Sequence, residues 1–157
     1  MATLGWISFA DLRDSYEVAT RGLIDGGVDL IVIETCQDLL QVKAAMIAAR
    51  RAMQAAGRVV PIQAQVTIET TGRMLLGTEI GAALAALGAM RPDVFGLNCA
   101  TGPQAMHGHR RPPSRYSTVP ITSGPNAVVP SPVHDTPPHP HPPPRLTRRP
   151  PTAAPPT

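Results

Sequence analysis

Three short apolar runs, each preceded by a segment with helical spacing, constrain the fold of this chain more than any other feature. The first run, Val28–Glu34, is almost continuously apolar and rich in β-branched residues, and similar runs follow at 61–67 and 93–98. Strands that are buried on both faces have this composition. Parallel strands also need helical crossovers between them. The sequence therefore predicts an α/β fold built on a parallel sheet.

Helical spacing and capping residues predict where the three helices lie. We expect them over residues 8–25, 38–56 and 78–90, with Ser8 as the N-cap of the first and Thr78 as a cap of the third. Glycines after the first two helices and a proline after the third are typical stop signals.

Each expected strand ends in polar residues. Glu34 and Thr35 end the first strand, Thr67 ends the second, and Asn98 and Cys99 end the third. The carboxyl ends of parallel strands meet at one edge, where βα folds carry their active sites. A closed eight-stranded barrel typically needs about 250 residues, whereas this chain has 157. We therefore expect about half a barrel, which has open edges and is marginally stable.

Proline and charge are unevenly distributed along the chain. Sixteen of the nineteen prolines and all five histidines lie between residues 107 and 157, with six arginines and a single acidic residue, Asp135. This composition predicts a disordered, basic tail. Neither a membrane span nor an export signal is evident, and the two cysteines are too few for a disulfide framework. The sequence thus favours a cytoplasmic protein.

Four motifs together resemble a known family. They are Asp25–Thr35, Val66–Gly77, Arg91–Asp93 and Gly96–Pro103 (Gly-Leu-Asn-Cys-Ala-Thr-Gly-Pro), in this order. This part of the chain, residues 1–106, resembles the homocysteine-binding domain of the cobalamin-dependent methionine synthases. The resemblance implies that the chain is a partial (β/α)8 TIM barrel, which begins at a point resembling the middle of that domain.

The resemblance also implies a set of site residues. Cys99 matches one of three zinc-binding cysteines, Glu34 matches the glutamate that binds the ammonium group of homocysteine, and Asn126 matches an asparagine beside the zinc. The other two cysteines belong to a Gly-Gly-Cys-Cys-Gly motif that this sequence does not contain. In the family, zinc-bound homocysteine takes its methyl group from methylcobalamin, which methyltetrahydrofolate regenerates on separate modules. We expect an incomplete zinc site, no residue that is catalytic by itself and a fragment that is inactive alone.

The resemblance is interrupted after residue 106. Residues 107–116 have the expected length but contain Pro112 and Pro113 where a helix should run, and the resemblance resumes at 117–122 and 125–127. We therefore expect a homocysteine-binding domain over 1–127, degraded at 107–116, followed by a disordered Pro/Arg/His-rich tail at 128–157. Our hypothesis for this pattern is a coding sequence that was read out of frame over these segments.

Other interpretations remain open at this stage. The methyl donor could be a sulfonium compound or betaine, although the Thr71–Gly77 segment favours the cobalamin enzymes. The basic, proline-rich tail could instead make the chain a non-enzymatic binding protein. We favour homocysteine as partner, with neither nucleic acid nor membrane. Cys36 is expected to pack in the core, and Glu69 and Arg73 to form a salt bridge that orders their loop.

Overall fold

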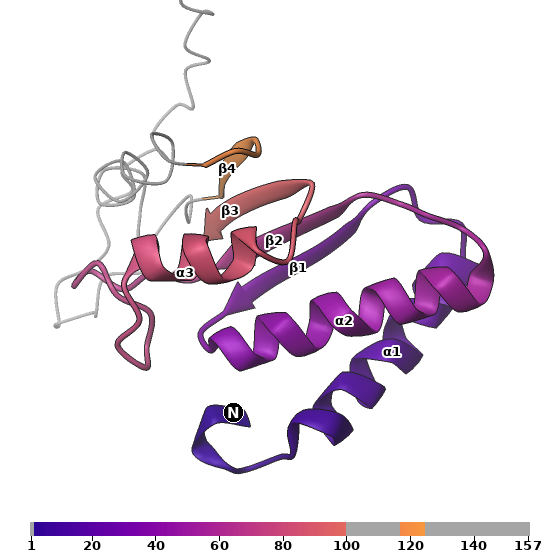
Figure 1. Cartoon of the computed structure of the whole chain (residues 1–157), viewed down its shortest axis with the longest axis horizontal. Helices are drawn as coiled ribbons and strands as arrows, with labels where there is room; N and C mark the ends of the chain where they lie inside the picture. Colours follow the sequence, from indigo (N-terminus) through magenta and orange to yellow (C-terminus); the bar gives the residue numbers. More distant parts are fainter. Residues whose placement is uncertain (1, 100–116, 125–157) are drawn as a thin grey trace, which may run out of the picture.

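The computed structural model describes residues 2–99 and 117–124 (Figure 1), which form a four-stranded sheet and its helices. The elements in chain order are η1 (Ala2–Leu4), α1 (Phe9–Asp25), β1 (Ile31–Cys36), α2 (Leu39–Ala56), β2 (Ile62–Val66), α3 (Ile80–Gly88), β3 (Val94–Asn98) and β4 (Ile121–Gly124). The strands lie in the order β1-β2-β3-β4, and every neighbouring pair is parallel. The predicted α/β fold with a parallel sheet is confirmed.

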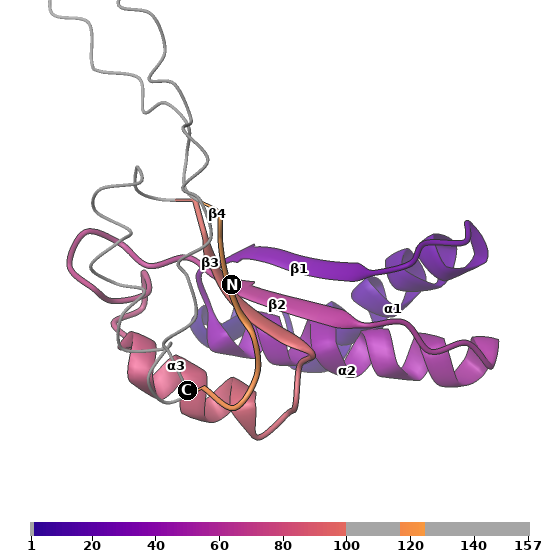
Figure 2. The ribbon, with the colours of Figure 1, turned by 90° about the horizontal axis from the view of Figure 1, so that it is seen from above.

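Helices α2 and α3 lie on the same face of the sheet (Figure 2), and α1 packs against α2. The core between them is formed by alternate strand residues, including Ile62, Ala64 and Val66 of β2 and Phe95 and Leu97 of β3, all buried. The intervening residues, such as Gln63, Gln65 and Gly96, point to the opposite face, which we call the open face. No helix of the described residues covers the open face.

Local signals set the ends of the first two helices as predicted. Oγ of Ser8 accepts a hydrogen bond from the Asp11 N–H (3.1 Å) at the start of α1. Asp38 caps α2 by accepting from the Leu40 N–H (2.9 Å). Gly57 ends α2 with φ of 64°, a left-handed conformation that glycine adopts without a steric penalty.

The predicted start of the third helix is wrong. Helix α3 begins at Ile80, not at Thr78, and its N-cap residue Glu79 makes no side-chain capping bond. The Thr78 carbonyl instead accepts from the Met74 N–H (2.8 Å) in the preceding turn. Thr78 is therefore part of that turn and is not available to begin the helix.

Strand β1 begins three residues later than expected, at Ile31 instead of Val28. The guanidinium of Arg58 donates to the carbonyls of Ile24 (3.2 Å) and Val28 (2.6 Å). These bonds hold residues after α1 in a turn, so pairing with β2 starts only at Ile31. A contact between residues 30 positions apart thus overrides the apolar pattern.

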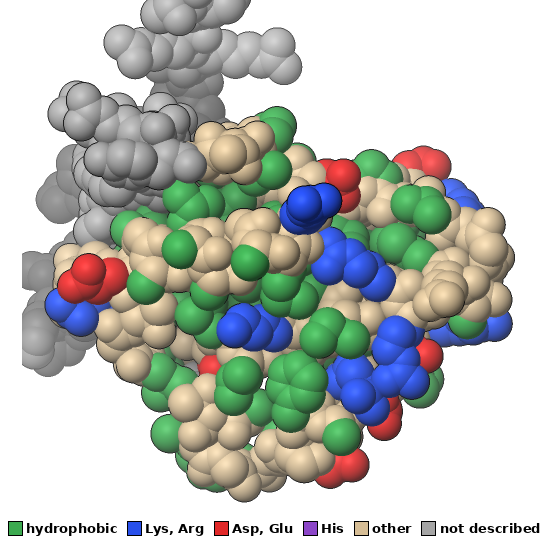
Figure 3. All heavy atoms as spheres, in the orientation of Figure 1, with side chains coloured by type: hydrophobic (Ala, Val, Ile, Leu, Met, Phe, Trp, Pro, Cys, Tyr) green, Lys and Arg blue, Asp and Glu red, His purple; other side chains and the backbone are tan. Residues whose placement is uncertain are grey.

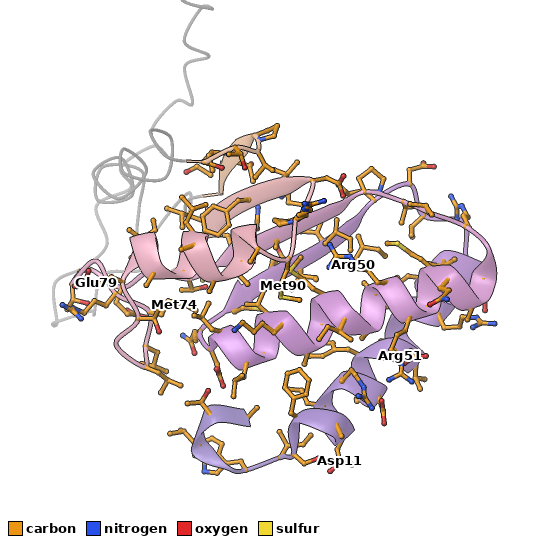
Figure 4. The ribbon with its side chains drawn as sticks, in the orientation of Figure 1. Asp11, Arg50, Arg51, Met74, Glu79 and Met90 are labelled. Carbon is orange, nitrogen blue, oxygen red and sulfur yellow. The ribbon has the colours of Figure 1, made fainter. Side chains whose placement is uncertain are left out.

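Polar contacts join the three helices at the surface. Arg51 of α2 bonds to Glu17 of α1 (2.9 Å), and Arg50 donates to the carbonyl oxygens of Met90 and Arg91 at the end of α3. Figure 4 shows Arg50 and Arg51 leaving α2 toward these two neighbours. In the space-filling view, Lys and Arg side chains gather over α2 and α1 with acidic groups beside them (Figure 3). None of the helices within residues 2–99 and 117–124 has both the length and the apolar character of a membrane span.

Candidate functional site

The candidate site lies at the carboxyl edge of the sheet, where β1, β2 and β3 end. Strand β1 contains a bulge there: Ile33 pairs with Ala64 and Cys36 with Val66, so β1 has one residue more than β2 between these pairs. Glu34 and Thr35 are consequently both exposed, and Cys36 returns to the buried face. Bulges reorient side chains next to functional sites, and this one turns Glu34 and Thr35 out of the core.

Thr35 and Asn98 are joined by two hydrogen bonds across the end of β2. The Thr35 N–H donates to Oδ1 of Asn98 (2.9 Å), and Nδ2 of Asn98 donates to Oγ1 of Thr35 (2.9 Å). We call this pair the Thr35–Asn98 link. Asn98 is only 8% exposed, so few water molecules can replace Thr35 as hydrogen-bond partners of its side-chain amide. The link connects strands that are not neighbours, because β2 lies between them.

The residues at both ends of the link have unusual backbone conformations. Thr35 has φ of 55° and Cys99, which follows Asn98, has φ of 62°. A positive φ is uncommon for residues other than glycine and is an outlier for a β-branched residue such as threonine. Each such residue costs about 1–3 kcal/mol and persists only where its surroundings impose it. Cys99 is further held by its N–H, which donates to the Gly124 carbonyl of β4 (3.1 Å).

The two cysteines differ in surroundings. Cys99 is half-buried at the carboxyl edge, whereas Cys36 is 2% exposed in the core. Burial, together with the nearby charges of Asp38 and Glu34, raises the pKa of the Cys36 thiol to about 12. A thiol with this pKa stays protonated at neutral pH and is a poor metal ligand. The predicted packing role of Cys36 is confirmed.

In the segment after β2, the structure corrects the predicted partner of Arg73 and shows an unpaired hydroxyl that the sequence did not indicate. Arg73 forms its ion pair with Glu79 (2.5 Å), not with Glu69 as expected. Glu69 is tied to the loop through its backbone, whose N–H donates to the Arg73 carbonyl (2.9 Å). Thr67, at the end of β2, has a buried Oγ1 with no hydrogen-bond partner in the structure. No signal in the sequence distinguishes such an unpaired hydroxyl from an ordinary strand end.

The described residues do not form a complete metal site. Residues 2–99 and 117–124 contain no group of three His, Cys, Asp or Glu side chains placed to hold a metal ion. Zinc sites in proteins normally have three or four protein ligands, and Cys99 alone does not meet this requirement. Asn126, the segment 107–116 and the tail at 128–157 lie outside the described residues, so the structure does not test the predictions made for them.

Sequence comparisons with known proteins show the family of this chain. The sequence profile of the homocysteine S-methyltransferase family matches residues 2–143, and the chain therefore belongs to this family. It is 54% identical over 130 residues to a methionine synthase of Mycobacterium tuberculosis (strain ATCC 25618 / H37Rv), and 51% identical over 130 residues to a methionine synthase of Mycobacterium leprae (strain TN). Each alignment covers 83% of this chain and 11% of the relative. The chain thus corresponds to a small part of a methionine synthase.

A solved structure shows the same fold. The apo form of the homocysteine methyltransferase MmuM from Escherichia coli superimposes with a TM-score of 0.54, over 76% of this chain and 53% of that one. Sequence identity is 16%, so this similarity concerns the fold alone. The family that the motifs indicated is confirmed. The motifs revealed neither the hydrogen bonds of Thr35 nor the unpaired hydroxyl of Thr67.

Proposed function

We propose that the chain is about half of a homocysteine-binding (β/α)8 barrel, with the domain over residues 1–127 and a separate tail at 128–157. Two features of the sheet support this. Its strands follow the order of the chain, and α2 and α3 lie on the same face, while no helix within residues 2–99 and 117–124 covers the other. Doubly wound sheets reverse their strand order and carry helices on both faces, whereas barrels do neither. The open face then corresponds to a barrel interior.

The substrate that fits the carboxyl edge is homocysteine. The observation that carries this proposal is the Thr35–Asn98 link, because it joins the residue after Glu34 to the residue before Cys99. Glu34 supplies an exposed carboxylate for the substrate ammonium group, a charge-assisted contact. Cys99 supplies a thiol at the opposite end, where the sulfur of the substrate would lie. Asn126 is proposed to lie beside the same sulfur.

The metal and the methyl donor belong to the same proposal. Zinc bound in part by Cys99 would lower the pKa of the homocysteine thiol, but its remaining ligands have to come from outside the described residues. Methylcobalamin is the proposed donor and methyltetrahydrofolate its methyl source, both on other modules of a cytoplasmic enzyme. A sulfonium or betaine donor is the alternative. We propose that the chain binds homocysteine weakly and transfers no methyl group by itself.

Titration of the full chain with L-homocysteine, followed by NMR chemical shifts in the presence and absence of Zn²⁺, tests this proposal. Removing the Glu34 carboxylate with Glu34→Gln should weaken binding by about tenfold or more, because a hydrogen bond to a charged group is worth roughly 1.5–3 kcal/mol. Glu17→Gln is the matched control, since Glu17 lies on α1, a different element, where it pairs with Arg51 of α2. Equal affinity of Glu34→Gln and the unmodified chain would refute the assignment of Glu34.

A further inference from the structure

We propose that the Thr35–Asn98 link is a positioning device that holds Glu34 and Cys99 in one fixed relation across β2. The inference rests on the proposed function, because it assumes that these two residues meet the two ends of one amino-acid substrate. Thr35 and Asn98 touch no substrate in this account. They act only through the residues next to them in the chain.

The geometry of the link supports a positioning role. Glu34 and Thr35 form the bulge of β1, where one extra residue interrupts the pairing with β2. A bulged segment loses regular strand pairing and needs other contacts to define its conformation. The link supplies them, since it engages both the backbone N–H and the hydroxyl of Thr35. Glu34 is therefore anchored through its neighbour, although its own side chain is exposed.

Cys99 is anchored in the same way from the other side. Its backbone has φ of 62°, a conformation that a cysteine rarely adopts without external constraint. Two contacts provide that constraint: the N–H of Cys99 bonds to Gly124 of β4, and the preceding side chain, Asn98, bonds to Thr35 of β1. The backbone at Cys99 is thus held by contacts to β4 and to β1.

A two-ended substrate explains why this connection spans β2. An amino acid with a thiol is held at its ammonium group by a carboxylate and at its sulfur by the opposite end of the site. Both contacts form together only if the two protein groups keep a constant separation. Neighbouring strands alone do not provide this, because Glu34 lies in a bulge and Cys99 lies beyond the end of β3.

The experiment compares Thr35→Val, Thr35→Ser and Asn98→Ala in the full chain. The first readout is the alkylation rate of Cys99 by iodoacetamide at fixed pH, located by mass spectrometry. Thr35→Val removes the bond from Nδ2 of Asn98 to the hydroxyl, and Asn98→Ala removes both bonds of the link. Each should raise this rate by about fivefold or more, and the double variant should add little to Asn98→Ala, because both act on the same link. Thr35→Ser keeps the hydroxyl and should retain the original rate.

Thr20→Val is the matched control for a general loss of stability. Thr20 is a buried threonine of α1 whose Oγ1 donates to the Tyr16 carbonyl (2.8 Å), and it is not part of the carboxyl edge. An increase of the Cys99 rate in Thr20→Val equal to that in Thr35→Val would overturn the proposal. So would a Thr35→Ser variant that reacts as fast as Thr35→Val.

The second readout is binding of L-homocysteine compared with L-2-aminobutyrate, which has the ammonium group but no thiol. Thr35→Val should weaken homocysteine binding by a larger factor than 2-aminobutyrate binding, because only homocysteine engages both ends. Equal factors for the two ligands would contradict the positioning role. If the unmodified chain binds neither ligand, the proposed function fails, while the alkylation rates still decide whether the link constrains Cys99.

Discussion

Gly96, in the middle of β3, is a position where the structure leaves no space for a side chain. A Cβ built there would lie 2.4 Å from Cγ2 of Thr122 and 3.0 Å from Cγ of Gln65. Ordinary contacts of a Cβ begin at about 3.4 Å. Gly96 lies between these residues because it pairs with Gln65 on one side and Thr122 on the other. Gly96→Ala therefore forces a methyl group into an occupied volume.

The expected cost follows from how well the neighbours can move. The Thr122 methyl group is on a β-branched side chain with restricted χ1, so the 2.4 Å contact requires either a rotamer change or a shift of β4. Inserting a methyl group into a packed region typically costs about 1–3 kcal/mol. We expect Gly96→Ala to lower the free energy of unfolding by about 2 kcal/mol.

Urea unfolding of the full chain, followed by circular dichroism, measures this change. Thr122→Ser removes Cγ2 and keeps the hydroxyl, so the double variant Gly96→Ala/Thr122→Ser should recover about 1 kcal/mol through the coupling of the two sites. Gly81→Ala is the control. Nothing lies within 4 Å of a Cβ at Gly81 in α3, and alanine there should stabilise the helix by about 0.5–1 kcal/mol.

Two results would refute this reasoning. One is a Gly96→Ala variant as stable as the unmodified chain, which would mean that β4 does not hold Thr122 against β3. The other is a double variant no more stable than Gly96→Ala, which would assign the cost to Gln65 or to the backbone. Because Gly96 lies two residues before Asn98, alanine at 96 should also disturb the Thr35–Asn98 link.

Three further predictions concern buried polar groups. Burial alone opposes ionisation of Asp38, but hydrogen bonds from Thr3 and the Leu40 N–H hold the pKa of its carboxyl below the usual range. The ionised carboxylate therefore contributes to the free energy of unfolding above about pH 3.9, and this contribution is lost as the pH falls through the lowered pKa. Asp38→Asn should therefore cost about 1–3 kcal/mol at pH 7 and progressively less toward pH 2 in urea unfolding; a difference independent of pH would contradict this. Thr67→Val should raise the free energy of unfolding by about 1 kcal/mol, since Oγ1 of Thr67 is buried without a partner, and a loss of stability would indicate a missed contact. Cys36, with its pKa raised to about 12, should be alkylated at neutral pH only as fast as the chain unfolds, which mass spectrometry in increasing urea would show; labelling of native Cys36 at the Cys99 rate would exclude its burial.

The sequence determined those features that depend on neighbouring residues. Helices α1 and α2 begin after Ser8 and Asp38, and α2 ends before Gly57, as these residues indicate, because capping involves contacts within one turn. The apolar runs showed the parallel sheet, because burial on both faces demands such a composition. The four motifs together indicated the family, which the matched profile over residues 2–143 confirms.

Contacts between distant residues were decided only by the tertiary structure. The late start of β1 depends on Arg58, the choice of Glu79 over Glu69 depends on how the loop after β2 folds, and the pairing of Thr35 with Asn98 joins residues 63 positions apart. No local pattern encodes these contacts, since each requires strand order and register to be established first. The sequence therefore predicts which strand-end residues form the proposed site, and the order β1-β2-β3-β4 places these strand ends along one edge.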